Sequence, residues 1–206
     1  PAPFIPANQV TSMALMFPRL ARNFVKNGYF PTDEPTLERA LNALMPSAPE
    51  SNGPKYILDP CAGEGVAIAE AAHALGREQA KAFAVEFDAE RARHARSLVD
   101  HCLHADLMDT MISKQSFGLL WLNPPYGDLS KDVNGNIGYQ GQGRARLEKL
   151  FYQRTLPLLQ YGGVLVFIVP GYVLDAELVG WLTRHYTDLR IYRAVETQFK
   201  QVVIFG

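Results

Sequence analysis

Short apolar runs alternate with helical patterns along most of the chain, and this alternation restricts the fold more than any other feature. Strand-like runs occur at 55–59, 81–87, 102–106, 117–122, 162–169, 189–195 and 201–205. Helical patterns separate most of them, at 65–75, 89–99, 145–159 and 175–186. Strands that alternate with helices form a mostly parallel sheet with helices on its faces. We therefore expect a doubly wound, Rossmann-like α/β fold with seven strands.

The last two predicted strands are connected in a different way from the others. Only residues 196–200 (ETQFK) separate them, which is too short for the crossover that parallel strands need. These strands must form an antiparallel hairpin. We expect one reversed strand, at the edge of an otherwise parallel sheet.

Length and composition limit the class of protein. With 206 residues, 48% of them hydrophobic, the chain is long enough for one well-cored domain. A net charge of −1 provides no general attraction for nucleic acid, so such binding would depend on local basic patches. Two cysteines are too few for a disulfide framework, and no signal peptide or long apolar span is present. We expect a cytoplasmic protein without a membrane partner. Because the sequence opens with Pro1 and stops at Gly206 directly after a strand, we also expect that it is a fragment of a longer protein.

Polar and glycine residues follow three of the predicted strands. The first strand leads into DPCAGEG, where Asp59 precedes Gly63 and Gly65, and a helix follows at once. The second strand ends at Glu86, about twenty residues later, and the third brings Asp106 to the same edge. Glycines allow close backbone approach to a ligand, and an acidic residue at this spacing typically accepts the hydroxyls of a ribose. The pattern predicts a nucleoside-like ligand, and a dinucleotide is disfavoured because G-x-G-x-x-G is absent.

A rigid turn follows the strand at 117–122. It reads Asn123-Pro124-Pro125-Tyr126. Proline fixes φ and has no N–H, so the neighbouring carbonyl groups are held in place and remain available as acceptors. The turn therefore predicts a recognition site for a hydrogen-bond donor.

Together these stretches resemble the class I S-adenosylmethionine-dependent methyltransferases, and among them the enzymes that methylate adenine N6 in DNA. The order of the motifs, with the cofactor loop before NPPY, is similar to the gamma arrangement of these enzymes. The resemblance implies S-adenosylmethionine as cofactor, a helical segment 1–45 that contributes to the cofactor site, and a catalytic domain 46–206. The segment GYFPT resembles the part that covers the methionine end of the cofactor. The implied cofactor residues are Tyr29, Phe30, Thr32, Asp59, Pro60, Cys61, Ala62, Gly63, Gly65, Glu86 (ribose), Phe87, Asp106 (adenine N6 of the cofactor), Leu107 and Asn123.

The resemblance also implies the chemistry of the NPPY turn. The Asn123 side-chain carbonyl and the Pro124 backbone carbonyl would accept the two hydrogens of the substrate amine and draw its nitrogen towards sp³ geometry. Pro125 would help to keep these acceptors preorganised, and Tyr126 would stack on a base that has left the duplex. Phe199, in a segment similar to the family's, would pack on the other side of the base. No general base is assigned.

DNA is the expected partner, and two groups of basic residues lie where it would pass. They are Arg144, Arg146, Lys149 and Arg154 in the first group, and Arg184, Arg190, Arg193 and Lys200 in the second. The alternative for the first group is that it forms an ordinary solvated helix face without contact to nucleic acid. The glycine-rich stretch 127–143 suits a lid or a plain surface loop. A target-recognition domain usually follows the last strand in the family, so a missing C-terminal region or a partner subunit is expected to provide it.

Several alternatives remain open or are excluded. Methylation of adenine in RNA and of glutamine N5 in a protein both use related turns, and a catalytically idle binding module would keep the same fold. Pro60-Cys61 resembles the nucleophile of cytosine-C5 methyltransferases, but it lies in the wrong loop. His101, Cys102 and His104 have metal-like spacing, yet neighbouring residues on a strand point to opposite sides, so no metal is expected.

Overall fold

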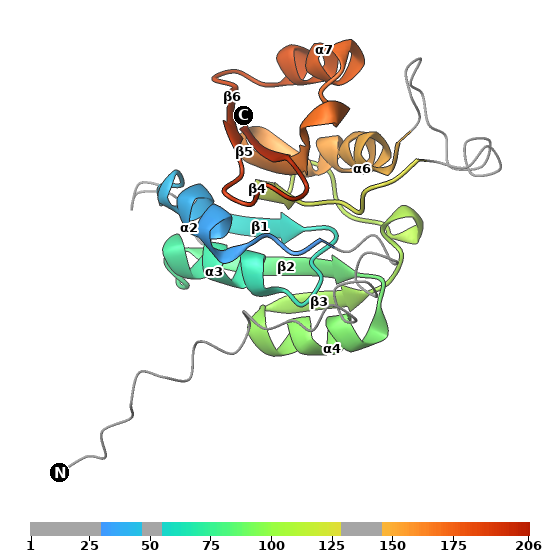
Figure 1. Cartoon of the computed structure of the whole chain (residues 1–206). Helices are drawn as coiled ribbons and strands as arrows, with labels where there is room; N and C mark the ends of the chain where they lie inside the picture. The colour runs from blue at the N-terminus through green and yellow to red at the C-terminus, as the bar shows by residue number, and fades with distance from the viewer. Residues whose placement is uncertain (1–29, 47–54, 129–145) are drawn as a thin grey trace.

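A seven-stranded sheet forms the centre of the molecule (Figure 1). The computed structural model describes residues 30–46, 55–128 and 146–206, and all structural statements concern these residues. The spatial order of the strands is β3-β2-β1-β4-β5-β7-β6. Their bounds are β1 Lys55–Asp59, β2 Ala80–Glu86, β3 His101–His104, β4 Phe117–Leu122, β5 Leu159–Pro170, β6 Arg190–Arg193 and β7 Gln201–Phe205.

Helices connect the strands and cover both faces of the sheet. Figure 1 shows α2 and α3 in front of the sheet. The α-helices are α2 Glu34–Asn42, α3 Val66–Ala74, α4 Ala89–Leu98, α6 Leu147–Thr155 and α7 Ala176–His185, and short 3₁₀ turns occupy Leu107–Asp109, Leu156–Leu158 and Gly171–Val173. Within the described ranges no helix combines the length and apolarity that a membrane crossing requires.

The strands alternate side chains between two apolar layers. Neighbours such as Ile57 and Leu58, or Trp121 and Leu122, belong to different layers because successive strand residues point to opposite faces. One layer includes buried residues of α2 and α3, and the other includes buried residues of α6 and α7. The sheet is therefore the middle layer of a three-layer α/β sandwich, and the predicted fold class is confirmed.

The predicted hairpin is present, but the position of the reversed strand was predicted wrongly. Strand β7 runs antiparallel to both β5 and β6, so it lies inside the sheet and β6 forms the edge. The side chain of Ile204 is fully buried in β7, whereas all four residues of β6 are exposed. The more apolar of the two strands thus takes the interior position, where both of its edges are hydrogen-bonded.

A side-chain cap fixes the start of α2. Asp33 is the N-cap, and its Oδ1 accepts a 3.0 Å hydrogen bond from the Thr36 backbone N–H. Thr32 is consequently left for another contact, described below. Residues 1–29 lie outside the described residues, so the division at 45/46 stays a prediction.

The direction of strand order changes between β1 and β4. From β1 the chain proceeds outwards through β2 to β3, and then returns to place β4 on the other side of β1. Open α/β sheets bind ligands at the carboxyl ends of the strands beside such a switch. Asp59 ends β1 and Asn123 follows β4, so the two predicted motifs meet at this point.

Candidate active site

A thiol connects the glycine loop to the NPPY turn. The Sγ of Cys61 lies 3.2 Å from the backbone oxygen of Asn123 and donates to it. Burial raises the pKa of this thiol, with further contributions from the negative charges of Asp59 and Glu86. The side chain is therefore a protonated structural donor, consistent with the exclusion of a nucleophilic cysteine.

The loop after β1 is held by backbone and carboxylate contacts. The Cys61 N–H donates to Asp59 Oδ1 over 3.0 Å, and the Ala62 N–H donates to the Val85 carbonyl of β2 over 3.0 Å. Gly63 has a positive φ of 56°, a conformation that favours glycine. Its N–H donates to Glu86 Oε2 over 2.8 Å. The loop and the end of β2 thus form one rigid unit.

Gly65 is required by packing as well as by backbone geometry. Its φ is +82°, and a Cβ added there would lie 2.9 Å from the Cβ of Ala95 in α4. The glycine therefore allows α3 to start close against α4. This accounts for Gly65 without any contact to a cofactor.

The carboxylate of Glu86 already accepts several hydrogen bonds from the protein. Besides Gly63, it receives the Asp88 N–H at 2.8 Å and two contacts from Arg91, Nε at 3.0 Å and a terminal nitrogen at 2.8 Å. Only about 5% of the residue is exposed. A ribose at this position would have to share these oxygens with Arg91 or displace it.

The carboxyl of Asp59 changes its protonation state close to neutral pH. It is 3% exposed, and this burial raises the pKa of its carboxyl to about 7. The N–H of Cys61 partly opposes the shift, and the charge of Glu86 adds to it. An ammonium group bound at this carboxylate would favour its ionised form.

The remaining predicted cofactor residues lie at the outer side of the same edge. Phe87 follows β2 and is 72% exposed, so its ring is accessible to a flat ligand. Asp106 is exposed, and its Oδ1 caps the following 3₁₀ turn through the Met108 N–H at 2.9 Å. Leu107 is buried and belongs to the apolar core. Of these three, Phe87 and Asp106 are accessible to a ligand.

The carboxamide of Asn123 is fixed at both ends. Its Nδ2 donates to the Phe30 carbonyl at 2.8 Å and to Thr32 Oγ1 at 3.3 Å. Its Oδ1 accepts from the hydroxyl of Tyr126 at 2.9 Å. The segment before α2 therefore orients the amide so that its oxygen, the acceptor, points towards Tyr126.

Three aromatic rings gather beside this amide. The ring of Phe30 stacks on Tyr126, with centroids 4.8 Å apart and planes 13° apart. The same ring meets Phe199 edge to face, at 4.7 Å and 64°. The structure thus brings together Phe30, Thr32, Asn123, Tyr126 and Phe199 from three distant parts of the chain. Tyr29 lies outside the described residues.

Comparison with known proteins assigns this arrangement to a family. The model of an uncharacterised methyltransferase family, DUF6094, matches residues 2–206. The chain belongs to this family. No curated protein is similar enough to the chain to count as a match.

Solved structures share the fold of this methyltransferase at low sequence identity. A type I restriction-modification methyltransferase subunit from Streptococcus thermophilus has a TM-score of 0.63 and 16% identity, covering 91% of this chain and 47% of the subunit. A class I S-adenosylmethionine-dependent methyltransferase from Listeria monocytogenes has a TM-score of 0.59 and 16% identity, covering 76% and 54%. Geranyl diphosphate C-methyltransferase from Streptomyces coelicolor, in complex with S-adenosylhomocysteine, has 0.52 and 12%, covering 82% and 76%. The chain thus spans about half the length of the first two.

S-adenosylmethionine is the cofactor that the sequence predicts for this methyltransferase, and the Streptomyces enzyme of similar fold holds S-adenosylhomocysteine. The residues at the carboxyl edge fit such a molecule in their chemistry. The buried acid Asp59 suits an ammonium group, the exposed ring of Phe87 suits an adenine face, and the exposed carboxylate of Asp106 suits an exocyclic amine. The carboxylate of Glu86 suits the ribose hydroxyls, although Arg91 already occupies one of its two oxygens.

The first predicted basic group is engaged within the protein. Arg146 is paired with Glu148 and Asp128, and Lys149 is paired with Asp175 and Glu177, at distances of 2.6–3.1 Å. Glu148 and Lys149 are fully buried. The predicted phosphate-binding role is therefore wrong for Arg146 and Lys149, whose charges hold the start of α6 against the NPPY segment and α7.

The rest of the basic residues divide by exposure. Arg154 donates to the Thr110 carbonyl and is partly buried. Arg144 and the stretch 129–145, which includes most of the proposed lid, lie outside the described residues. The second group is exposed: Arg184, Arg190, Arg193 and Lys200. The surface around β6 is consequently the one predicted basic patch that remains accessible in the described part of the chain.

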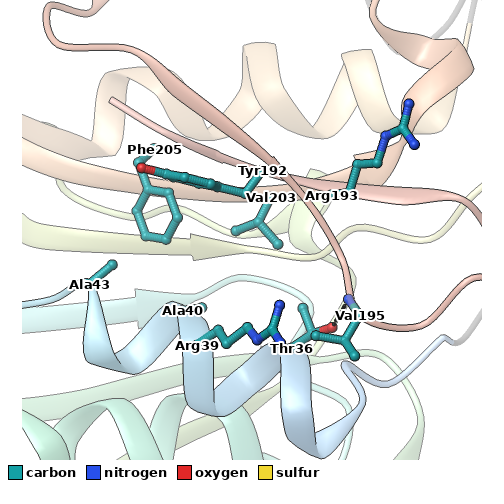
Figure 2. A pocket seen from close by; sticks show the side chains of 9 residues that line it. All are labelled: Thr36, Arg39, Ala40, Ala43, Tyr192, Arg193, Val195, Val203 and Phe205. Carbon is teal, nitrogen blue, oxygen red and sulfur yellow. Dashed lines mark hydrogen bonds between the residues drawn. The ribbon is translucent and has the colours of Figure 1, made fainter.

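A separate hollow of about 300 Å³ lies between α2 and the β6–β7 hairpin (Figure 2). Small side chains on α2 leave this space where larger ones would close the contact with the sheet. Its lining is Thr36, Arg39, Ala40, Ala43, Tyr192, Arg193, Val195, Val203 and Phe205. Arg193 belongs to the second basic group, but none of these residues belongs to the predicted cofactor, catalytic or base-binding residues, so the contacts of the motifs define the candidate active site.

One residue of the site has no counterpart in the sequence prediction. Gln201 begins β7, is 3% exposed, and its Nε2 donates to the Tyr126 hydroxyl oxygen over 2.7 Å. A single glutamine at the start of an apolar strand carries no local signal of such a contact. Only the pairing of β7 beside β5 brings it to the NPPY turn.

Proposed function

We propose that this methyltransferase transfers a methyl group to the exocyclic N6 of adenine in nucleic acid, with DNA preferred to RNA. The observation that carries the proposal is the orientation of the Asn123 carboxamide. Its nitrogen is held by Phe30 and Thr32, which leaves its oxygen as an acceptor beside a stacking ring. A conjugated amine needs such an acceptor, because its lone pair must be withdrawn from the ring before it can attack.

The aromatic arrangement supports a ring-shaped substrate. Phe30 stacks face to face on Tyr126 and lies edge to face against Phe199. A six-membered ring is therefore accommodated between these two side chains, next to the Asn123 amide. A purine would gain the same contacts on replacing the ring of Phe30, whereas the side chain of a glutamine substrate has no ring to stack. This favours adenine over glutamine N5.

The roles of the chain's residues follow from these contacts. Asn123 Oδ1 and the Pro124 carbonyl accept the two amine hydrogens, Pro125 keeps the turn rigid, and Tyr126 and Phe199 orient the base. When bound, the cofactor supplies an electrophilic methyl group on a sulfonium. The amine nitrogen would form the new C–N bond as the bond between the methyl carbon and sulfur breaks to leave a neutral thioether, and the methylated nitrogen would then lose one proton to solvent. No residue of the chain needs to become covalently bonded to the substrate.

DNA is proposed as the substrate class for two reasons. The exposed residues Arg184, Arg190, Arg193 and Lys200 provide positive charge around the outer strands. One protein of similar fold is a restriction-modification methyltransferase subunit, of which the chain spans 47%. Selection of a target sequence is assigned to a further domain or a partner subunit.

The test is methyl incorporation from labelled cofactor into DNA and RNA oligonucleotides with and without adenine, and into a glutamine-containing protein. Asn123→Ala should lower turnover on adenine by at least about 100-fold while cofactor affinity, measured by calorimetry, stays within about threefold. Mass spectrometry of the nucleosides identifies the methylated atom. Equal turnover by wild type and variant, or methylation only of protein, refutes the proposal; methylation only of RNA changes the substrate class.

A further inference from the structure

The hydrogen bonds around Asn123 form a chain with one direction. Gln201 Nε2 donates to the Tyr126 oxygen at 2.7 Å, and the Tyr126 hydroxyl donates to Asn123 Oδ1 at 2.9 Å. Asn123 Nδ2 then donates to the Phe30 carbonyl and Thr32 Oγ1. Tyr126 and Asn123 each accept one hydrogen bond and donate onward. The direction of the first bond therefore affects the orientation of the last group.

Gln201 is built into the sheet at a place where its side chain cannot easily move away. Its neighbour across the sheet is Pro170 at the end of β5, and its carbonyl accepts the Ala194 N–H at 3.0 Å. The residue is 3% exposed. An amide buried to this extent needs its hydrogen-bond partners, because an unpaired buried donor costs free energy.

The hydroxyl of Tyr126 is the link that can be turned. A phenol hydrogen lies near the ring plane and has two favoured directions, so a donor on one side of the oxygen leaves the hydrogen to point to the other side. Burial raises the pKa of Tyr126, so the hydroxyl keeps its proton at neutral pH. With Gln201 as donor, that proton is directed to Asn123.

Reversal of the Asn123 carboxamide is thereby opposed at both ends. A reversed amide would place its NH₂ against the Tyr126 proton and its oxygen against the Phe30 carbonyl. Both contacts would be repulsive, and both occur in a partly buried site. The orientation that presents the acceptor oxygen is the only one that satisfies the chain of hydrogen bonds.

We propose that Gln201 is a positioning residue for methyl transfer, which acts by directing the Tyr126 hydroxyl and so fixing the Asn123 carboxamide with its oxygen available to the substrate amine. This inference rests on the proposed function for its catalytic consequence. The structural part, that Gln201 controls the Asn123 amide, holds independently of the substrate.

The test replaces the donor with an acceptor. Gln201→Glu has almost the same shape, but an ionised carboxylate only accepts, so the Tyr126 proton turns towards it and away from Asn123. We expect kcat on an adenine substrate to fall by about 10- to 100-fold at pH 8, with KM within about threefold. As the pH is lowered, the introduced carboxyl becomes a donor again, and the variant should recover towards wild type. Gln201→Leu should lose activity without this recovery.

Two controls separate positioning from a general structural effect. Gln160→Glu adds the same charge at the opposite end of the sheet, beside Gly118 at the start of β4, and should leave the pH profile of wild type unchanged. Tyr126→Phe removes the hydroxyl while keeping the ring. In that background Gln201→Glu should cause no more than about a twofold further loss, because the link is already broken.

An NMR measurement decides the structural part without any substrate. The side-chain amide resonances of Asn123, identified by their loss in Asn123→Asp, should shift and exchange faster with water in Gln201→Glu than in Gln160→Glu. If wild type methylates no adenine but these resonances respond, the proposed function fails and the positioning by Gln201 stands. Unchanged resonances, no recovery at low pH, or additive losses in the Tyr126→Phe background overturn the inference.

Discussion

The buried carboxyl of Asp59 should make the protein less stable as the pH rises. Its pKa is raised from an ordinary 3.8 to about 7, mainly by burial. Between these two values the folded protein holds a proton that the unfolded chain has lost. Stability therefore falls with increasing pH in this window, which is the opposite of the usual effect of an ion-paired aspartate. Asp59→Asn should remove the effect, because its amide oxygen can still accept the Cys61 N–H and no charge is buried.

The size of the effect follows from the shift. One pKa unit corresponds to about 1.36 kcal/mol, so a shift of about three units amounts to roughly 4 kcal/mol. The difference in unfolding free energy, Asp59→Asn minus wild type, should change by about this amount in favour of the variant between pH 4 and pH 8. Above pH 8 the difference should be constant, since Asp59 is ionised in both states.

The assay is urea unfolding at half-unit intervals from pH 4 to pH 8, followed by tryptophan fluorescence. The fully buried Trp121 provides the signal. Glu70→Gln, on the exposed side of α3, serves as the control for loss of one carboxylate, and its difference from wild type should vary little with pH. A pH-independent difference for Asp59→Asn, or a wild type that gains stability relative to it as the pH rises, would refute the reasoning.

Three further predictions concern ligands. Glu86→Ala should weaken cofactor binding by about 10- to 100-fold in calorimetry. Unchanged affinity in Glu86→Ala would remove Glu86 from the site. Arg91→Ala should not weaken cofactor binding, because it releases the Glu86 oxygen that Arg91 now occupies. Phe30→Leu should lower KM for single-stranded adenine by about 2- to 10-fold with little change in kcat, because the base no longer has to displace the Phe30 ring from Tyr126. A raised KM would show that the Phe30 ring helps to bind the substrate. Binding to matched duplex DNA should be weak and steeply salt-dependent. Mismatched or single-stranded adenine should be methylated faster than adenine in a matched duplex, because unstacking the base then costs less free energy. Tight, salt-insensitive binding to one duplex sequence would contradict this prediction.

Local sequence was sufficient for most of the sheet. Strands β1, β4 and β7 match the predicted runs residue for residue, because each is an apolar segment bounded by turn residues or glycine. Strands β2, β3, β5 and β6 differ from their predicted runs at the ends, and β3 stops at His104, two residues before the end of the predicted run 102–106. Asp106 caps a 3₁₀ turn, and this capping bond ends the strand early. A short side chain that bonds to its own backbone thus outweighed the apolar pattern.

Ion pairs between distant segments could not be predicted. Lys149 looked like part of a basic surface because its partners lie far along the chain, Asp175 at the N-cap of α7 and Glu177 in its first turn. Only the pairing of β4 with β5, followed by the return of the chain into α7, places these carboxylates beside α6. The burial of a charge is a property of such neighbours, and a charge count along the sequence contains no information about it.

The NPPY turn illustrates why a motif alone does not specify a site. Two prolines fix the backbone at Asn123, yet they do not determine which end of the carboxamide faces the substrate. That choice depends on the Phe30 carbonyl before α2, on the Tyr126 hydroxyl, and on Gln201 at the start of β7. Residues 30 and 201 are separated by most of the chain, and they are linked through Asn123 and Tyr126 only because β7 is inserted next to β5. The reversed strand, misplaced by the sequence prediction, is therefore the element that completes the hydrogen-bond chain around the amide.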